Sequence, residues 1–159
     1  MLSKTDAATI EDKRLYLEDF AVGQTYRSGS LTVTAADIKA YAAQFDPQPF
    51  HLDETAAKAT FFGGLVASGW HTAALTMRLL VDGGAPIAGG IIGAGLDELR
   101  WPRPVRPGDT LHTESEVVEM RPSHSRPEGF IKMRTTTLNQ NDEPVQVMVA
   151  NLLVPRRVK

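Results

Sequence analysis

An aspartate and a histidine lie five positions apart in a segment that also contains two prolines. They are Asp46 and His51, with Pro47 and Pro49 between them. A carboxylate and an imidazole that face one water molecule can act on it as an acid/base pair. Because proline moves the residue before it toward extended backbone, we expect a stiff, bent, non-helical connector that aims both side chains into one cleft. The structural alternative is an Asx-type turn at Asp46 and an ordinary loop histidine.

Hydrophobic spacing and helix caps predict the helices around this segment. Thr34 is expected to cap a short amphipathic helix that ends before Pro47. Asp53 is expected to cap a brief helix, and Ser68 a longer one. The longer helix is predicted to be buried, because it is apolar over much of its circumference. One apolar face carries Trp70, Ala73, Ala74, Met77, Leu80 and Val81, and Leu75 and Leu79 add apolar surface elsewhere.

The remaining segments predict strands separated by turns, at residues 24–32, 91–101, 111–120, 130–138 and 145–154. In the last strand, Gln146 alternates with valines, which predicts a more polar face at its start. The expected fold class is α+β, with an antiparallel sheet wrapped around one central apolar helix. We expect residues 1–15 to form an N-terminal tail and residues 16–159 a single domain.

Composition argues against several classes of function. The 159 residues carry a formal net charge of −2 and include no cysteine, which gives no bulk attraction for nucleic acid and excludes thiolate metal sites. The longest low-charge region, residues 61–96, is broken by glycines and charges, so no membrane span is expected. Residues 1–13 lack a signal-peptide pattern, which favours a cytoplasmic protein. His71, His112 and His124 have no partners at metal-ligand spacing, so they are interpreted as structural or surface residues and no metal site is expected.

Two segments together resemble a known family. They are FDPQPFHLDETAAKATFFGGLVASGWH, from Phe45, and LRWPRPVRPGDTL, from Leu99. The pattern D-x-[NQ]-P-x-H, followed by P-V-x-P-G-D, resembles the MaoC-like dehydratases, which include (R)-specific enoyl-CoA hydratases. The resemblance covers roughly residues 16–155 and implies a single hotdog fold, built as a homodimer or a larger assembly of dimers. The implied substrate is an acyl-CoA or acyl-carrier-protein thioester that enters a tunnel near the subunit interface, with CoA as part of the substrate and no separate cofactor.

The same resemblance assigns roles to individual residues. Asp46 and His51 correspond to the catalytic pair, and the backbone N–H of Gly69 corresponds to the donor that receives the thioester oxygen. Substrate contacts are expected from Gln48, Phe50, Ser68 and Trp70. Gln48 stands where many hydratases carry Asn, and Ser68 stands where many carry His.

Three arginines interleave with prolines in the second segment: Arg100, Arg103 and Arg106. Arginine forks suit phosphate oxygens, so Arg103 is a candidate for binding the phosphates of CoA. The alternative is a solvated, charged edge that discourages association of sheets.

The reaction implied by the family is the interconversion of a trans-2-enoyl thioester and a (3R)-3-hydroxyacyl thioester, which makes the protein a carbon-oxygen lyase of fatty acid metabolism. A second reading is a hotdog acyl-CoA thioesterase, in which a carboxylate directs water onto the thioester carbonyl. A third is a non-catalytic acyl-binding subunit. The sequence leaves the acyl chain, the carrier and the physiological direction open.

Overall fold

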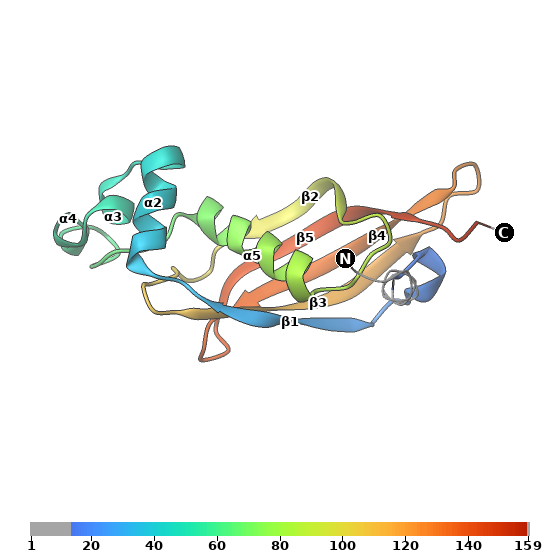
Figure 1. Ribbon diagram of the computed structural model, residues 1–159, viewed down its shortest axis with the longest axis horizontal. Coiled ribbons are helices and arrows are strands. Elements are labelled where there is room, and N and C mark those ends of the chain that lie inside the picture. The colour runs from blue at the N-terminus through green and yellow to red at the C-terminus, as the bar shows by residue number, and fades with distance from the viewer. Residues whose placement is uncertain (1–13, 159) are drawn as a thin grey trace, which may run out of the picture.

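The computed structural model describes residues 14–158 and contains a five-stranded antiparallel sheet with one long helix along it. The strand order across the sheet is β1-β3-β4-β5-β2. The long helix, α5 (Gly69–Gly83), lies against one face of the sheet (Figure 1). The strands are β1 (Thr25–Thr32), β2 (Ile92–Arg100), β3 (Thr110–Arg121), β4 (Glu128–Leu138) and β5 (Pro144–Pro155). The predicted α+β class, with a sheet wrapped around a central helix, is confirmed.

All five predicted strands are present, close to their predicted ends. The polar residue at the start of one face of β5, Gln146, is fully buried. Its amide is satisfied inside the protein: Trp101 Nε1 donates to Gln146 Oε1, and Gln146 Nε2 donates to Thr76 Oγ1 on α5. A buried amide with partners for both its groups is compatible with a sheet interior, so polarity alone did not indicate its position.

Three short helices gather beyond one end of the sheet (Figure 1). They are α2 (Ala35–Phe45), α3 (Pro49–Leu52) and α4 (Glu54–Lys58). Two predicted caps are confirmed: Asp37 N–H donates to Thr34 Oγ1 over 3.1 Å, and Ala56 N–H donates to Asp53 Oδ1 over 2.7 Å. The short 3-10 helix η1 (Leu17–Asp19) lies near the other end of the sheet.

The segment from Asp46 to His51 is partly helical, which corrects the expectation of a non-helical connector. Gln48 is extended (φ −111°, ψ 150°), as the following proline requires, but Pro49 starts the single turn of α3. Proline suits the first position of a helix because its missing N–H would have no partner there. His51 therefore belongs to a helical turn, while Asp46 ends α2.

The predicted burial of α5 holds for only part of its circumference. The helix buries His71, Thr72, Thr76, Leu79 and Leu80, whereas Trp70, Met77 and Val81 are exposed in this chain. Thr76 Oγ1 lies 2.6 Å from Thr137 Oγ1 of β4, so a polar side chain faces the sheet without losing hydrogen bonds. Hydrophobic spacing missed this face because two of its members are threonines.

The apolar interior forms two clusters. One lies between η1, the end of α5 and the middle of the sheet, and includes Leu80, Ile131 and Val154. The other lies between the short helices and the sheet, and includes Ile38, Leu79 and Leu111. The second cluster holds α2 and α4 against the sheet. Asp46 follows the last residue of α2, so this packing also positions Asp46.

The predicted tail boundary falls at the start of the described residues. Leu15 forms an isolated β-bridge with Ile87, and its N–H donates to the Pro86 carbonyl. Residues 1–13 of the predicted tail lie outside the described residues. Within residues 14–158, no helix is long and apolar enough to cross a membrane.

Candidate active site

The structure brings the Asp46 and His51 side chains together. Asp46 Oδ2 and His51 Nε2 lie 3.3 Å apart, where α2 ends and α3 turns back. The His51 side chain is 7% exposed and that of Asp46 19%. The pair is therefore largely withdrawn from bulk water but reachable from one side.

A second strip of chain holds the imidazole in one orientation. His51 Nδ1 lies 2.6 Å from the Val66 carbonyl oxygen, and Val66 N–H donates to the Phe50 carbonyl over 3.0 Å. Because a carbonyl can only accept, Nδ1 must carry the hydrogen of this bond. In the neutral ring, Nε2 is then the nitrogen with a free lone pair, directed at the Asp46 side of the site.

Asp46 is the most heavily hydrogen-bonded carboxylate in this region. Ser68 Oγ donates to Asp46 Oδ2 over 2.6 Å, and Gln48 Nε2 donates to Asp46 Oδ1. Burial raises the pKa of the Asp46 carboxyl, but these two hydrogen bonds and the charge of a protonated His51 outweigh burial, so its pKa lies below the ordinary value. Asp46 is consequently a charged acceptor at neutral pH.

The Ser68–Asp46 bond corrects the predicted role of Ser68. Ser68 does occupy the N-cap position of α5, but its side chain makes no capping hydrogen bond. Its hydroxyl reaches across to the aspartate instead. This bond ties the start of α5 to the Asp46–His51 pair.

Gly69 begins α5 directly beside that bond. As the first helical residue its N–H has no partner within the helix, and no acceptor among residues 14–158 binds it. A Cβ at this position would lie 2.8 Å from Trp101 Cδ2 and Cε2, which is closer than such atoms approach. Glycine is thus required by the Trp101 indole, which rests against the first turn of α5.

The other predicted contact residues divide between the site and the surface. The Phe50 ring packs edge-on against His51, with centroids 4.5 Å apart. Trp70 is 59% exposed and packs edge-on against Trp101 at 5.4 Å. Arg103 is exposed and forms an ion pair with Glu143, Nη2 to Oε2 at 2.9 Å.

Three residues near the pair escaped the sequence reasoning. Trp101 was not singled out and Gln146 was considered only as a strand residue, because their hydrogen bond joins positions 45 residues apart. His71 was interpreted as structural or surface; it is buried and stacks on Tyr41, with centroids 4.6 Å apart and rings inclined by 6°. Burial lowers the pKa of His71, which keeps the ring neutral.

An apolar cavity of about 100 Å³ lies further along α5, between the helix and the sheet. Met77 and Leu80 line it from α5, Met133 from β4 and Ala150 from β5. It also reaches Leu96 of the edge strand β2. The cavity has the dimensions and chemistry to take a few methylene groups.

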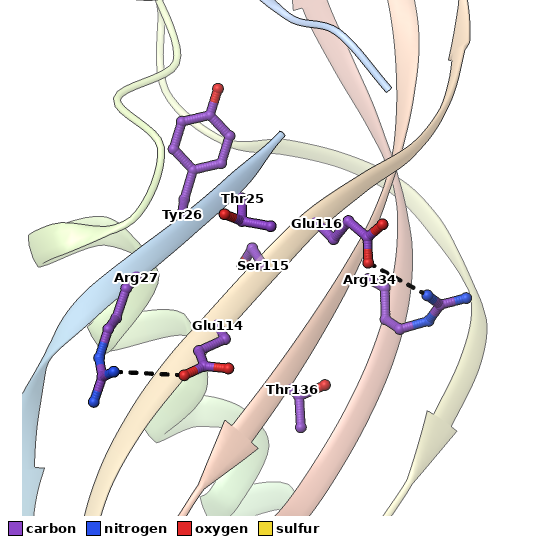
Figure 2. A pocket seen from close by; sticks show the side chains of 8 residues that line it. All are labelled: Thr25, Tyr26, Arg27, Glu114, Ser115, Glu116, Arg134 and Thr136. Atoms are coloured by element: carbon purple, nitrogen blue, oxygen red, sulfur yellow. Dashed lines mark ion pairs between the residues drawn. The ribbon is translucent and has the colours of Figure 1, made fainter. Parts of the chain in front are cut away.

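A second depression, of about 500 Å³, lies on the face of the sheet turned away from α5 (Figure 2). Its charges are paired: Arg27 with Glu114 at 3.6 Å and Arg134 with Glu116 at 3.8 Å. Its β1 residues, 25–27, are at the far end of that strand from α2 and Asp46. This depression is not part of the Asp46–His51 site. Within residues 14–158, no cluster of three His, Cys, Asp or Glu side chains could hold a metal ion.

Comparison with known proteins agrees with this architecture. The MaoC-like domain family matches residues 19–139. The MaoC-like dehydratase from Rhodospirillum rubrum is 56% identical, with a TM-score of 0.88 over 91% of this chain and 99% of that one. The R-hydratase PhaJ1 from Pseudomonas aeruginosa, in its unliganded form, is 28% identical, with a TM-score of 0.71 over 91% of this chain and 88% of that one. Uncharacterized protein YdeM of Bacillus subtilis is 32% identical over 88% of this chain and 99% of its own.

The chain belongs to the MaoC-like dehydratase family and has the α+β hotdog fold. The resemblance in the sequence is therefore confirmed. Its relatives include hydratases and dehydratases.

Proposed function

We propose that the protein interconverts a trans-2-enoyl thioester and a (3R)-3-hydroxyacyl thioester, with CoA as the carrier. In the hydration direction, the oxygen of water bonds to the β-carbon, one hydrogen of that water leaves as a proton, and a proton is added at the α-carbon. The observation that carries this proposal is the 3.3 Å contact between Asp46 and His51. The hydrogen bond from Ser68 to Asp46 connects this pair to the start of α5. The hydratase and dehydratase names of its relatives support the same reaction class.

Asp46 and His51 would share the water. Their 3.3 Å separation leaves no room for a water molecule between them, so the water contacts both atoms from the open side of the pair. The Asp46 carboxylate accepts one hydrogen bond from it, and in hydration His51 Nε2 takes its proton and passes a proton to the α-carbon. Dehydration reverses both transfers, so His51 ends each turnover neutral. The Val66 carbonyl keeps His51 in the tautomer that this exchange needs.

Gly69 N–H would receive the thioester oxygen. Negative charge grows on that oxygen as the β-carbon is attacked, and an unpaired N–H at a helix N-terminus stabilises such charge. Phe50 and Gln48 border the pair, and Trp70 borders the first turn of α5, in keeping with contacts to substrate.

The remainder of the substrate would extend in two directions. The apolar cavity lined by Met77 and Met133 suits the acyl chain. Arg103 suits a CoA phosphate, which would share the guanidinium with Glu143 or replace it.

Two copies of the chain would complete the site as a homodimer. Trp70, Met77 and Val81 are exposed along α5, and Ile92 and Leu96 along the edge strand β2. Pairing of two identical faces would cover both an apolar helix surface and an unpaired strand edge. The cytoplasmic location expected from the sequence stays a prediction.

The decisive experiment compares wild type with Asp46→Asn on a short trans-2-enoyl-CoA. Loss of the carboxylate should lower kcat by at least about 100-fold, because it removes both the acceptor that holds the water and the negative charge that stabilises protonated His51 3.3 Å away. Asp53→Asn is the matched control, since asparagine also caps a helix and the Asp53 side chain accepts its hydrogen bond from Ala56 of α4. Unchanged turnover in folded Asp46→Asn would overturn the assigned pair.

The same assay separates the two alternatives. Thiol release from saturated acyl-CoA would indicate a thioesterase. Tight binding without turnover across a chain-length panel would indicate an acyl-binding subunit.

A further inference from the structure

A buried chain of hydrogen bonds leads from the middle of the sheet to the first turn of α5. Thr137 of β4 contacts Thr76 of α5, and Gln146 of β5 donates to Thr76 Oγ1 over 3.2 Å. Gln146 Oε1 then accepts from Trp101 Nε1 over 3.0 Å. Thr76, Thr137 and Gln146 are each fully buried, so solvent cannot replace any of these partners.

Trp101 connects this series of hydrogen bonds to the site. Its indole is held at the nitrogen by Gln146, and its six-membered ring edge rests against Gly69. The same loop contributes a second attachment, because Ala67 N–H donates to the Val105 carbonyl over 2.9 Å. The backbone just before and at the first turn of α5 is therefore fixed on two sides by residues 101–105.

We propose that Trp101 and Gln146 are positioning residues for the Gly69 N–H: Gln146 fixes the indole, and the indole fixes the first turn of α5 and the slot for the thioester carbonyl. This inference rests on the proposed function, which makes that N–H the donor to the thioester oxygen. A preorganised donor acts only where its direction is held, and a misplacement of about 1 Å can cost about 100-fold in rate.

The location of the hydrogen bond distinguishes this role from ordinary packing. Trp101 is 41% exposed, and its neighbour Trp70 is more exposed still, so the indole is not held by a surrounding core. The bond from Nε1 to Gln146 is the indole's one directional attachment within the described residues, beside its packing against Trp70 and Gly69. Gln146 in turn lies too deep to touch substrate directly, being fully buried on β5.

The test uses Trp101→Phe, which removes the N–H but keeps an aromatic ring against Gly69, and Gln146→Leu, which removes the acceptor with little change in volume. Each should lower kcat for a short enoyl-CoA by about 10- to 100-fold. KM and the pH profile should stay within about twofold and unshifted, because Asp46 and His51 are untouched. The double variant should be no slower than Gln146→Leu alone, because both changes break the Trp101–Gln146 bond and only Gln146→Leu also breaks the bond to Thr76.

Ser115→Ala is the matched control. It removes another buried hydroxyl contact, to Thr135 Oγ1 at 2.8 Å, in a part of the sheet that does not lead to Trp101. It should leave kcat unchanged. If Gln146→Leu does not fold, the kcat of Trp101→Phe decides the test. Trp101 is partly exposed, so its replacement should not prevent folding.

A second readout separates failure of this inference from failure of the proposed function. The carbonyl ¹³C resonance of [1-¹³C]butyryl-CoA should move downfield on binding to wild type and move less in Trp101→Phe and Gln146→Leu. Wild type that hydrates enoyl-CoA while both variants keep full kcat and the full shift would overturn the positioning role. Wild type that polarises the carbonyl but never hydrates would overturn the proposed function and leave the positioning role standing.

Discussion

The first turn of α5 and its second half, here called its polar end and its apolar end, have different surroundings. At its start, Ser68 and Gly69 lie beside charged and hydrogen-bonding groups, among them the Asp46 carboxylate, whose pKa is lowered. Nine residues later, Met77 lines an apolar cavity. At 1.5 Å per residue these surroundings lie about 13 Å apart on one rigid element. A substrate that spans both would have its reacting carbons and its tail recognised by separate groups, which can be changed independently.

The largest effect is expected at the apolar end. Met133→Ala removes a buried side chain from the cavity wall and should lower the free energy of unfolding by about 2–5 kcal/mol. It should also raise the ratio of kcat/KM for longer over shorter enoyl-CoAs, because the cavity grows. Denaturant unfolding and a chain-length series measure the two effects.

Met120→Ala is the control for this change. Met120 packs against the same core cluster but does not line the cavity, so its loss should leave the chain-length ratio as in wild type. If Met133→Ala and wild type have the same ratio of kcat/KM for longer over shorter enoyl-CoAs, the cavity does not determine which acyl chain is used.

A smaller effect is expected at the polar end from Ser68→Ala. A hydrogen bond to a charged group contributes about 1.5–3 kcal/mol, so kcat should fall about tenfold or more. The pKa of Asp46 should rise toward its ordinary value, because one of the groups that lower it is gone. NMR titration of the carboxyl carbon and steady-state kinetics report these changes. Ser30→Ala, on the exposed surface of β1, should change neither; an unshifted Asp46 titration in Ser68→Ala would contradict the assigned bond.

The smallest effect concerns the pH dependence of stability. The pKa of His71 is lowered in the folded protein, so the unfolded chain binds a proton first as the pH falls below about 6.5. Stability should therefore decrease as the pH falls from about 7 toward the lowered value, with a slope of at most about 1.4 kcal/mol per pH unit for this group. His71→Gln should flatten the curve in that window.

His124→Gln, at an exposed loop position, is the control for His71 and should keep the wild-type slope. The comparison is made above about pH 5, because carboxylates such as Asp46 add the same sign of dependence nearer their own pKa values. An unchanged slope in His71→Gln would show that the buried ring does not govern this range.

The strands and two helix caps were predictable because their signals are local. Alternation and turn residues gave all five strands, and the side chains of Thr34 and Asp53 sit within one turn of the N–H groups that they accept from. The turn at Pro49 was missed for a local reason as well: the restriction before a proline acts on Gln48, whereas Pro49 itself is suited to a helix start.

The site was only partly predictable. The proximity of Asp46 and His51 was expected from their connector, but the role of Ser68 depends on a partner 22 positions away. The buried face of α5 was mispredicted because Thr72 and Thr76 face inward, where Thr137 and Gln146 satisfy Thr76. Such contacts arise from tertiary packing and leave no periodic pattern in the sequence.

The edge-on packing of Trp70 and Trp101 has a practical consequence. These are the chain's two tryptophans, and their ring centroids are 5.4 Å apart. Tryptophan emission from the native protein therefore originates from one small region, the entrance of α5, with no tryptophan elsewhere to dilute it. Ligand occupancy there can be titrated without a dye, and a mismatch between emission and far-ultraviolet circular dichroism during denaturation would reveal that this entrance loosens before the sheet does.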